Sequence, residues 1–182
     1  MDPAREPQSA FDADAPRSAD QLFVEVYDRL KAMAGRRLAA GPRGTLDTTG
    51  LVHELYLRMN AGERLRFSHP AQFFTYAARA MRHLLTDRAR VRLSQRAGGE
   101  WLQVTLTGSD PDLAIASAEQ ALALDEGLQR LEREDARAAQ VVELLYFGGL
   151  TLEEVARTLD VARRTVDRDW RWARAFLKAE LD

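Results

Sequence analysis

The chain has 182 residues, of which 28 are acidic and 26 are basic, so its formal net charge is −2. This near balance argues against a general nucleic-acid coat, which depends on surplus positive charge to release counterions. The sequence contains no cysteine, which excludes disulfides and thiolate metal sites, and no apolar run of membrane-spanning length is visible, so we expect a cytoplasmic protein with no membrane partner.

The first half of the chain predicts a tail followed by a small helical domain. Residues 1–18 are rich in Pro, Ala and Asp and bury too little apolar surface to order themselves, which predicts a disordered acidic tail. Apolar residues then recur with helical spacing in three stretches, the first from near Asp20, the second between Leu51 and Met59 and the third after Pro70. We expect residues 19–92 to fold as one three-helix domain.

The third of these stretches, FFTYAARAMRHLLTDRAR, combines aromatic and basic side chains. Aromatic rings can stack on unpaired bases, and arginines can hold a phosphate backbone. The alternative interpretation is that the aromatic rings lie in the core and the arginines are merely solvated. We expect Phe73 and Phe74 to be core residues. The predicted contacts with single-stranded DNA are Tyr76, Arg79, Arg82, His83, Arg88 and Arg90.

The second half predicts a linker and a second helical domain. Periodicity lapses over residues 93–117, which contain glycines and a short β-prone stretch without a partner strand, so we expect an extended, flexible linker. Helical spacing returns over residues 118–182, with a turn at Gly148 and Gly149. The fold class expected for the whole chain is therefore all-α.

A helix-turn-helix is predicted near the end of the chain. Thr151 and Glu154 have the spacing of a capping box, and Asp160 stands in the turn, where its side chain tolerates a left-handed backbone. The second helix, from about Arg163 to Lys178, is expected to bury Val166, Trp170, Ala173 and Leu177. Its predicted DNA contacts are Arg163, Arg164, Thr165, Asp167, Arg168, Arg171 and Arg174.

One of these predicted contacts is acidic. The carboxylate of Asp167 would repel phosphate unless Arg163, Arg164 or Arg171 pairs with it, or it could accept a hydrogen bond from a cytosine amino group. We therefore expect an unusual preference for the duplex element that this helix reads.

The order and spacing of these segments over Gln21–Leu181 resemble a sigma-70 family initiation factor of the extracytoplasmic-function (ECF) type. The stretch LVHELYLRM resembles the helix that docks on the clamp helices of RNA polymerase. The stretch FFTYAARAMRHLLTDRAR resembles the helix that melts the promoter and reads its minus-10 element. Residues 118–182 resemble the domain that reads the minus-35 element and touches the polymerase flap. The resemblance implies a sigma domain 2-like bundle and a sigma domain 4-like helix-turn-helix joined by a flexible linker. The implied partners are core RNA polymerase and promoter DNA. For the chain itself we expect no enzymatic activity, no cofactor and no metal.

The resemblance also implies where the polymerase docks and how docking is controlled. The implied docking residues are Asp47, Leu51, Val52, Glu54 and Leu55. Family members commonly carry an acidic cluster where this chain has Asp47, Thr48 and Thr49, and phosphorylation of either threonine would add roughly −1.5 to −2 charge at a helix start. We therefore hypothesise control by a Ser/Thr kinase. The simpler interpretation is that one threonine is a helix N-cap, and an anti-sigma factor is the other candidate regulator.

Other function classes fit the sequence less well. His53 and Glu54 resemble the start of a zinc-protease motif, but Leu57 stands where its second histidine would be, and no P-loop, dinucleotide fingerprint or nucleophile elbow is present. A dimeric helix-turn-helix regulator explains the C-terminal motif but not the basic, aromatic helix. A polymerase-binding adaptor that reads no promoter is the third alternative.

Overall fold

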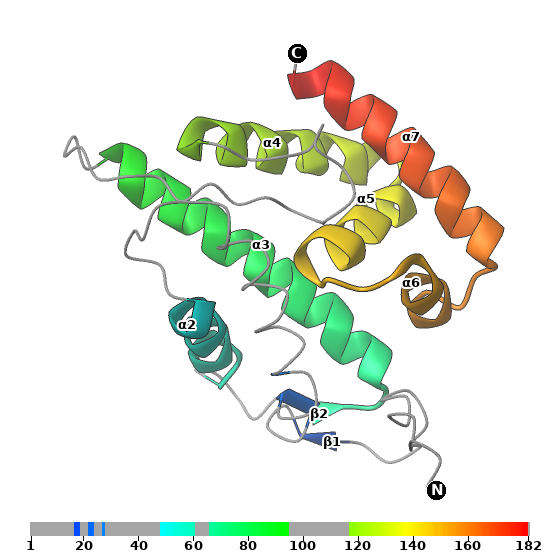
Figure 1. The fold of residues 1–182 in the computed structure, drawn as a ribbon, viewed down its shortest axis with the longest axis horizontal. Helices are drawn as coiled ribbons and strands as arrows, with labels where there is room; N and C mark the ends of the chain where they lie inside the picture. The colour runs from blue at the N-terminus through cyan, green and yellow to red at the C-terminus, as the bar shows by residue number, and fades with distance from the viewer. Residues whose placement is uncertain are drawn as a thin grey trace, which may run out of the picture.

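The structure, a computed structural model, describes residues 17–18, 22–23, 27, 48–60, 66–94 and 117–181. These residues are almost entirely helical, which confirms the all-α fold class (Figure 1). The helices are α2 (Thr48–Asn60), α3 (Pro70–Ser94), α4 (Ala118–Glu134), α5 (Ala136–Val142), α6 (Leu152–Thr158) and α7 (Arg163–Leu181), with a π-helical turn, η2 (Glu143–Phe147), continuing α5. Two short strands, β1 (Arg17–Ser18) and β2 (Arg66–Phe67), pair antiparallel.

Two boundaries differ from the sequence-based expectation. Arg17–Ser18 falls within the predicted tail, yet it forms β1, because pairing with β2 satisfies its backbone groups. Helix α3 continues to Ser94, two residues into the predicted linker. The rest of the tail, linker residues 95–116 and most of the first predicted helix lie outside the described residues.

The first half packs around α2 and α3. Val52, Leu55 and Met59 lie three and four residues apart on α2, so they share one face, and all three are buried. Leu22 and Phe23 join the same core, where the ring of Phe23 lies 4.8 Å from that of Tyr56. This burial fixes α2 on one side of α3.

In the second half, the first two helices each begin with a side-chain N-cap. Ser117 accepts a hydrogen bond from the amide of Gln120 at the start of α4, and Asp135 accepts one from the amide of Ala138 at the start of α5. The wide turn of η2 then ends at Gly148, where an added Cβ would lie 2.6 Å from the carbonyl oxygen of Leu144. Only glycine therefore allows the chain to pass this point without moving the backbone.

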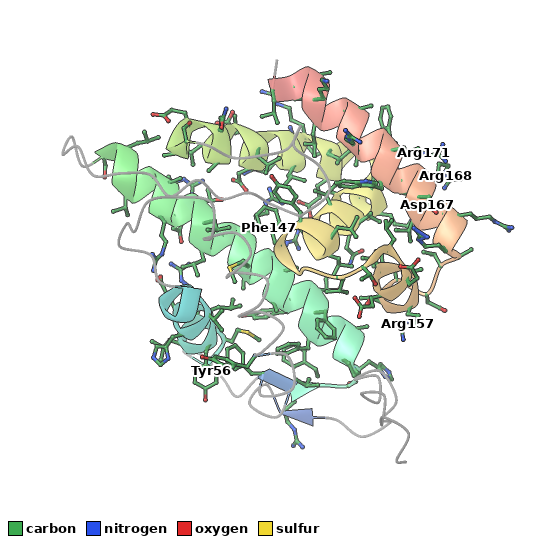
Figure 2. All side chains as sticks on the ribbon, in the orientation of Figure 1. Tyr56, Phe147, Arg157, Asp167, Arg168 and Arg171 are labelled. Carbon is green, nitrogen blue, oxygen red and sulfur yellow. The ribbon has the colours of Figure 1, made fainter. Side chains whose placement is uncertain are left out.

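The two halves are in contact through α3. Figure 1 shows this helix crossing the molecule between α2 and α4, and α3 packs along both α4 and η2. Figure 2 shows Phe147, from η2, in the interior, where it is buried with Tyr146. The buried apolar residues of the two halves thus form one continuous core.

None of the described helices combines the length and apolar character that crossing a lipid bilayer requires.

Candidate nucleic-acid interface

The helix-turn-helix consists of α6, a turn and α7. Its capping box is present as predicted, because the amide of Glu154 donates to Thr151 Oγ1 at 3.3 Å and the amide of Thr151 donates to Glu154 Oε2 at 2.8 Å. Asp160 has a φ of 52°, which confirms the left-handed residue in the turn. The packing side of α7 carries Val166, Asp169, Ala173 and Leu177, all buried, whereas Trp170 is only half-buried, unlike the prediction.

The outer side of α7 carries the predicted duplex contacts. Figure 2 shows Asp167, Arg168 and Arg171 on the side of the helix away from α3. Arg164 and Arg171 are exposed, and 67% of the Arg168 side chain is accessible. Thr165 and Arg174 are half-buried. A helix with an exposed arginine face and a packed opposite face can lie in a major groove.

Arg163 and Asp167 neutralise each other at the start of α7. Arg163 Nη2 lies 3.2 Å from Asp167 Oδ1, and Arg163 Nη1 lies 3.1 Å from Glu153 Oε1 on α6. Arg163 is one of the three arginines expected as partners of Asp167, and its positive charge reduces the repulsion that Asp167 would exert on a phosphate. The pairing also engages the guanidinium of Arg163, whereas the side chain of Arg164 is exposed.

The aromatic residues of α3 divide between the core and the surface. Phe73 and Phe74 are buried, as expected, whereas Tyr76 is 39% exposed. The Tyr76 ring lies 5.9 Å from that of Phe67, which β2 places next to the first turns of α3, and Phe67 in turn packs edge-on against Phe73. Tyr76 therefore presents a supported ring to solvent, which suits stacking on an unpaired base.

The predicted DNA-binding arginines of α3 are engaged by carboxylates. Arg88 pairs with Glu54, and Arg90 lies 3.3 Å from Asp87. Arg79 pairs with Glu132 of α4. Arg82 differs most from the expectation, because it is buried between α3 and the second half and cannot reach DNA in this arrangement. His83 is exposed.

The implied polymerase-docking residues of α2 lie mostly inside. Val52 and Leu55 are buried in the core instead of forming a surface, and Glu54 is half-buried beside Arg58 and Arg88. The exposed side of α2 carries His53 and Leu57, which the sequence analysis did not assign to docking. Asp47 lies outside the described residues, and for Thr48, Thr49 and Leu51 only the helical backbone is described.

A comparison with protein families agrees with this geometry. The profile of the family described as ECF sigma factor matches residues 10–182, nearly the whole chain. The chain belongs to the ECF sigma factor family. ECF sigma factors are non-enzymatic initiation factors that bind core RNA polymerase and direct it to promoters, and the family implies sigma2 and sigma4 domains. No curated protein and no solved structure matches the chain significantly.

This sigma factor has a buried carboxylate on its helix-turn-helix that the sequence analysis missed. Asp169 is 3% exposed, Arg137 Nε of α5 donates to its Oδ2 at 2.6 Å, and Arg168 Nη2 donates to its Oδ1 at 3.2 Å. The signal was an aspartate at helical spacing within the apolar stripe of α7. Asp169 thus ties α7 to α5 and also holds the guanidinium of Arg168, whose side chain is exposed.

The pKa of Asp169 reflects this environment. Burial alone would raise the pKa, but hydrogen bonds and positive charge from Arg137 and Arg168 outweigh it and hold the pKa of Asp169 below its ordinary value. The hydrogen bond to Asp169 likewise raises the pKa of Arg137. The pair is therefore ionised at neutral pH.

Replacing Asp169 with asparagine should lower the free energy of unfolding by about 2 kcal/mol at neutral pH, because hydrogen bonds to a charged group are lost. A lowered folded pKa stabilises the fold above the unfolded pKa and stops doing so as pH falls through the folded pKa. Wild type should therefore lose stability below about pH 4 more steeply than the variant. Urea unfolding across pH measures both effects.

The matched control is Asp167→Asn, which removes an exposed ion pair from the same helix and should cost at most about 0.5 kcal/mol. Equal unfolding midpoints for wild type and Asp169→Asn at neutral pH would refute the anchoring role.

Across the described ranges, no group of three or more His, Cys, Asp or Glu side chains is arranged to hold a metal ion.

Proposed function

We propose that this sigma factor reads the minus-35 element with α7 and melts and reads the minus-10 element with the N-terminal part of α3, while α2 docks on the polymerase clamp. In this division, residues 19–92 act as the sigma domain 2-like unit and residues 118–182 as the sigma domain 4-like unit. The observation that carries the proposal is the exposed arginine face of α7, made by Arg164, Arg168 and Arg171 and held by a capped helix-turn-helix.

The exposed ring of Tyr76 supports the second part of the proposal. Unstacking bases costs a few kcal/mol, which new contacts with aromatic side chains offset. Phe67 backs the Tyr76 ring, and Arg66 and His69 lie exposed nearby in sequence. Together they could capture an unpaired base beside the first turns of α3.

The test is a pull-down with core RNA polymerase followed by run-off transcription on a cognate promoter. An initiation factor with this division of labour should bind the core enzyme and start transcripts at one site. Specific duplex binding without the core enzyme would favour the dimeric regulator, and core binding without initiation would favour the adaptor. Either result would overturn the proposal.

Phosphorylation is the proposed control of polymerase docking. Helix α2 starts at Thr48 and carries no acidic residue in its first turn. Backbone amides at a helix start and the helix dipole both favour an anion there, so a phosphate on Thr48 or Thr49 would be stabilised and would supply the negative charge for docking on a basic surface. The kinase would be of the Ser/Thr class.

Thr48→Ala/Thr49→Ala protein should lose most transcription activity under inducing conditions, and phosphatase treatment should weaken core binding of wild type about tenfold. Ser94→Ala removes an exposed hydroxyl from the end of α3 and should leave activity unchanged. If the double variant drives transcription as well as wild type, the kinase hypothesis is wrong, and an anti-sigma factor becomes the leading regulator. Co-purification from uninduced cells would then identify it.

A further inference from the structure

A buried carboxylate on α7 holds the exposed arginine that precedes it. The guanidinium of Arg168 donates to Asp169 Oδ1 from Nε at 3.3 Å and from Nη2 at 3.2 Å. The side chain of Asp169 is 3% exposed, whereas 67% of the Arg168 side chain is accessible. One end of this contact is therefore packed inside the fold, and the other end lies at the surface.

Arg137 of α5 fixes the carboxylate that Arg168 uses. Its Nε donates to Asp169 Oδ2 at 2.6 Å, and its Nη2 donates to Oδ1 at 3.4 Å, so the fork of Arg137 engages both oxygens. Helices α5 and α7 also pack against each other. Asp169 cannot follow Arg168 toward solvent without leaving Arg137, which would cost the stabilisation of a buried charge.

The contact with Asp169 uses one edge of the Arg168 guanidinium and leaves the adjacent edge available. A guanidinium carries five N–H groups in a planar fork. Asp169 accepts along the edge that Nε and Nη2 form, and among the residues that the structure describes none accepts from Nη1. The N–H groups of Nη1 and Nη2 on that adjacent edge are the paired donors that match O6 and N7 of guanine in a major groove.

The other arginines on the outer side of α7 are held differently. Figure 2 shows Arg171 beside Arg168 on this side, and its Nε donates to the main-chain oxygen of Asp167 on the same helix at 3.2 Å. Arg163 pairs with carboxylates that are themselves partly accessible, and Arg164 is exposed. Within the described outer face of α7, Arg168 is the arginine whose guanidinium is held from inside the fold.

Holding an arginine before it meets DNA favours discrimination between bases. A solvated arginine side chain loses rotamer entropy on binding and can turn to a phosphate instead of a base edge. A guanidinium held by a fixed carboxylate has already lost part of that freedom, and its available edge points in one direction. The buried carboxylate can therefore determine which base Arg168 accepts.

We propose that Asp169 is a positioning residue for base recognition: anchored by Arg137, it presents the free edge of Arg168 to one guanine of the minus-35 element and thereby sets specificity at that base pair. This inference rests on the proposed role of α7 in reading the minus-35 element. It adds that recognition of one base depends on a side chain that is itself buried and makes no contact with DNA.

The first test measures base preference one position at a time. Reconstituted holoenzyme is titrated with promoters in which each minus-35 base pair is replaced in turn, and Arg168→Ala identifies the position at which preference is lost. That base should be guanine, preferred over adenine by wild type about 10- to 100-fold. Asp169→Asn should reduce this preference below about threefold and leave the other minus-35 preferences unchanged.

Glu180→Gln is the matched control. Glu180 is another carboxylate of α7 that pairs with an arginine from a different helix, Arg130 of α4, but it lies far along the helix from Arg168. Its preference for the guanine should stay within about twofold of wild type. A purely structural role of Asp169 would instead weaken binding to all minus-35 variants alike, and that result would overturn the proposal, as would a base other than guanine at the Arg168 position.

A second measurement needs no substitution, so it decides the question even if Asp169→Asn fails to fold. In the free full-length protein, the Nε–H group of Arg168 should have an NMR order parameter close to that of rigid backbone, because Asp169 holds it. The Nε–H group of exposed Arg164 is the internal reference and should have an order parameter below about 0.6. Equal mobility of the two groups would contradict positioning by Asp169.

The same titrations separate failure of this inference from failure of the proposed function. If neither Arg164→Ala nor Arg168→Ala alters any minus-35 preference, α7 is not the reading helix and the proposed function fails with the inference. If Arg168→Ala abolishes one preference and Asp169→Asn retains it at the wild-type level, only the positioning role of Asp169 is rejected.

Discussion

Replacing Arg164 and Arg168 together with alanine is expected to weaken promoter binding by the holoenzyme about 100-fold while leaving its association with core polymerase unchanged. Both side chains lie on the outer face of α7, and each base or phosphate contact of this kind contributes about 1–3 kcal/mol. The fold should persist, because Asp169 keeps its hydrogen bond to Arg137. Footprint titration on a cognate promoter measures the loss.

The matched control for this variant removes two positive charges from a different helix. Arg130→Ala/Arg133→Ala acts on exposed positions of α4 and should change promoter affinity only a few-fold, through the general field. The α7 variant should also flatten the dependence of binding on salt by about one unit for each phosphate that it no longer binds. Equal losses in the two double variants would mean that α7 is not the reading helix.

The second large effect is expected at Tyr76. Stacking of one base on an aromatic ring contributes about 1–3 kcal/mol, so Tyr76→Ala should reduce open-complex formation about 10- to 100-fold on duplex promoters. A promoter that is already unpaired at the minus-10 element should recover most of the loss, because the unstacking step is bypassed. Permanganate reactivity of thymines at the start site measures the opening.

Two controls separate stacking from folding in this experiment. Tyr76→Phe keeps the ring and should open promoters at nearly the wild-type rate, and Val91→Ala trims an exposed side chain at the far end of α3 without effect. Tyr76 is 39% exposed, so its removal should cost little stability. Normal opening by Tyr76→Ala would contradict base capture at this position.

The helix-turn-helix was predictable because its signals are local. The capping box joins Thr151 and Glu154, three residues apart, and the left-handed turn residue is a single aspartate. The apolar stripe of α7 was largely right as well. At Trp170 and Asp169 the predicted stripe is wrong by one position. Periodicity alone does not resolve this shift, because Asp169 is buried through an ion pair with Arg137, 32 residues away.

The environment of α3 was not predictable, because it depends on distant pairing. Arg82 meets carboxylates 43 and 61 residues further along the chain, and no short-range pattern marks them. For α2, the family resemblance implies polymerase contacts at Val52 and Leu55, but both are buried in the fold. An apolar stripe does not distinguish a core face from a docking face. The exposed pair His53 and Leu57 becomes visible only once the packing of α2 is known.

The central claim is that this sigma factor recognises two separated promoter elements only on the polymerase. Selection of bound fragments from a genomic library, with reconstituted holoenzyme and with the free protein in parallel, tests it most directly. The holoenzyme should enrich fragments that share two short blocks about 25 base pairs apart, and the free protein should enrich none. Enrichment of one palindromic site by the free protein alone would contradict the claim.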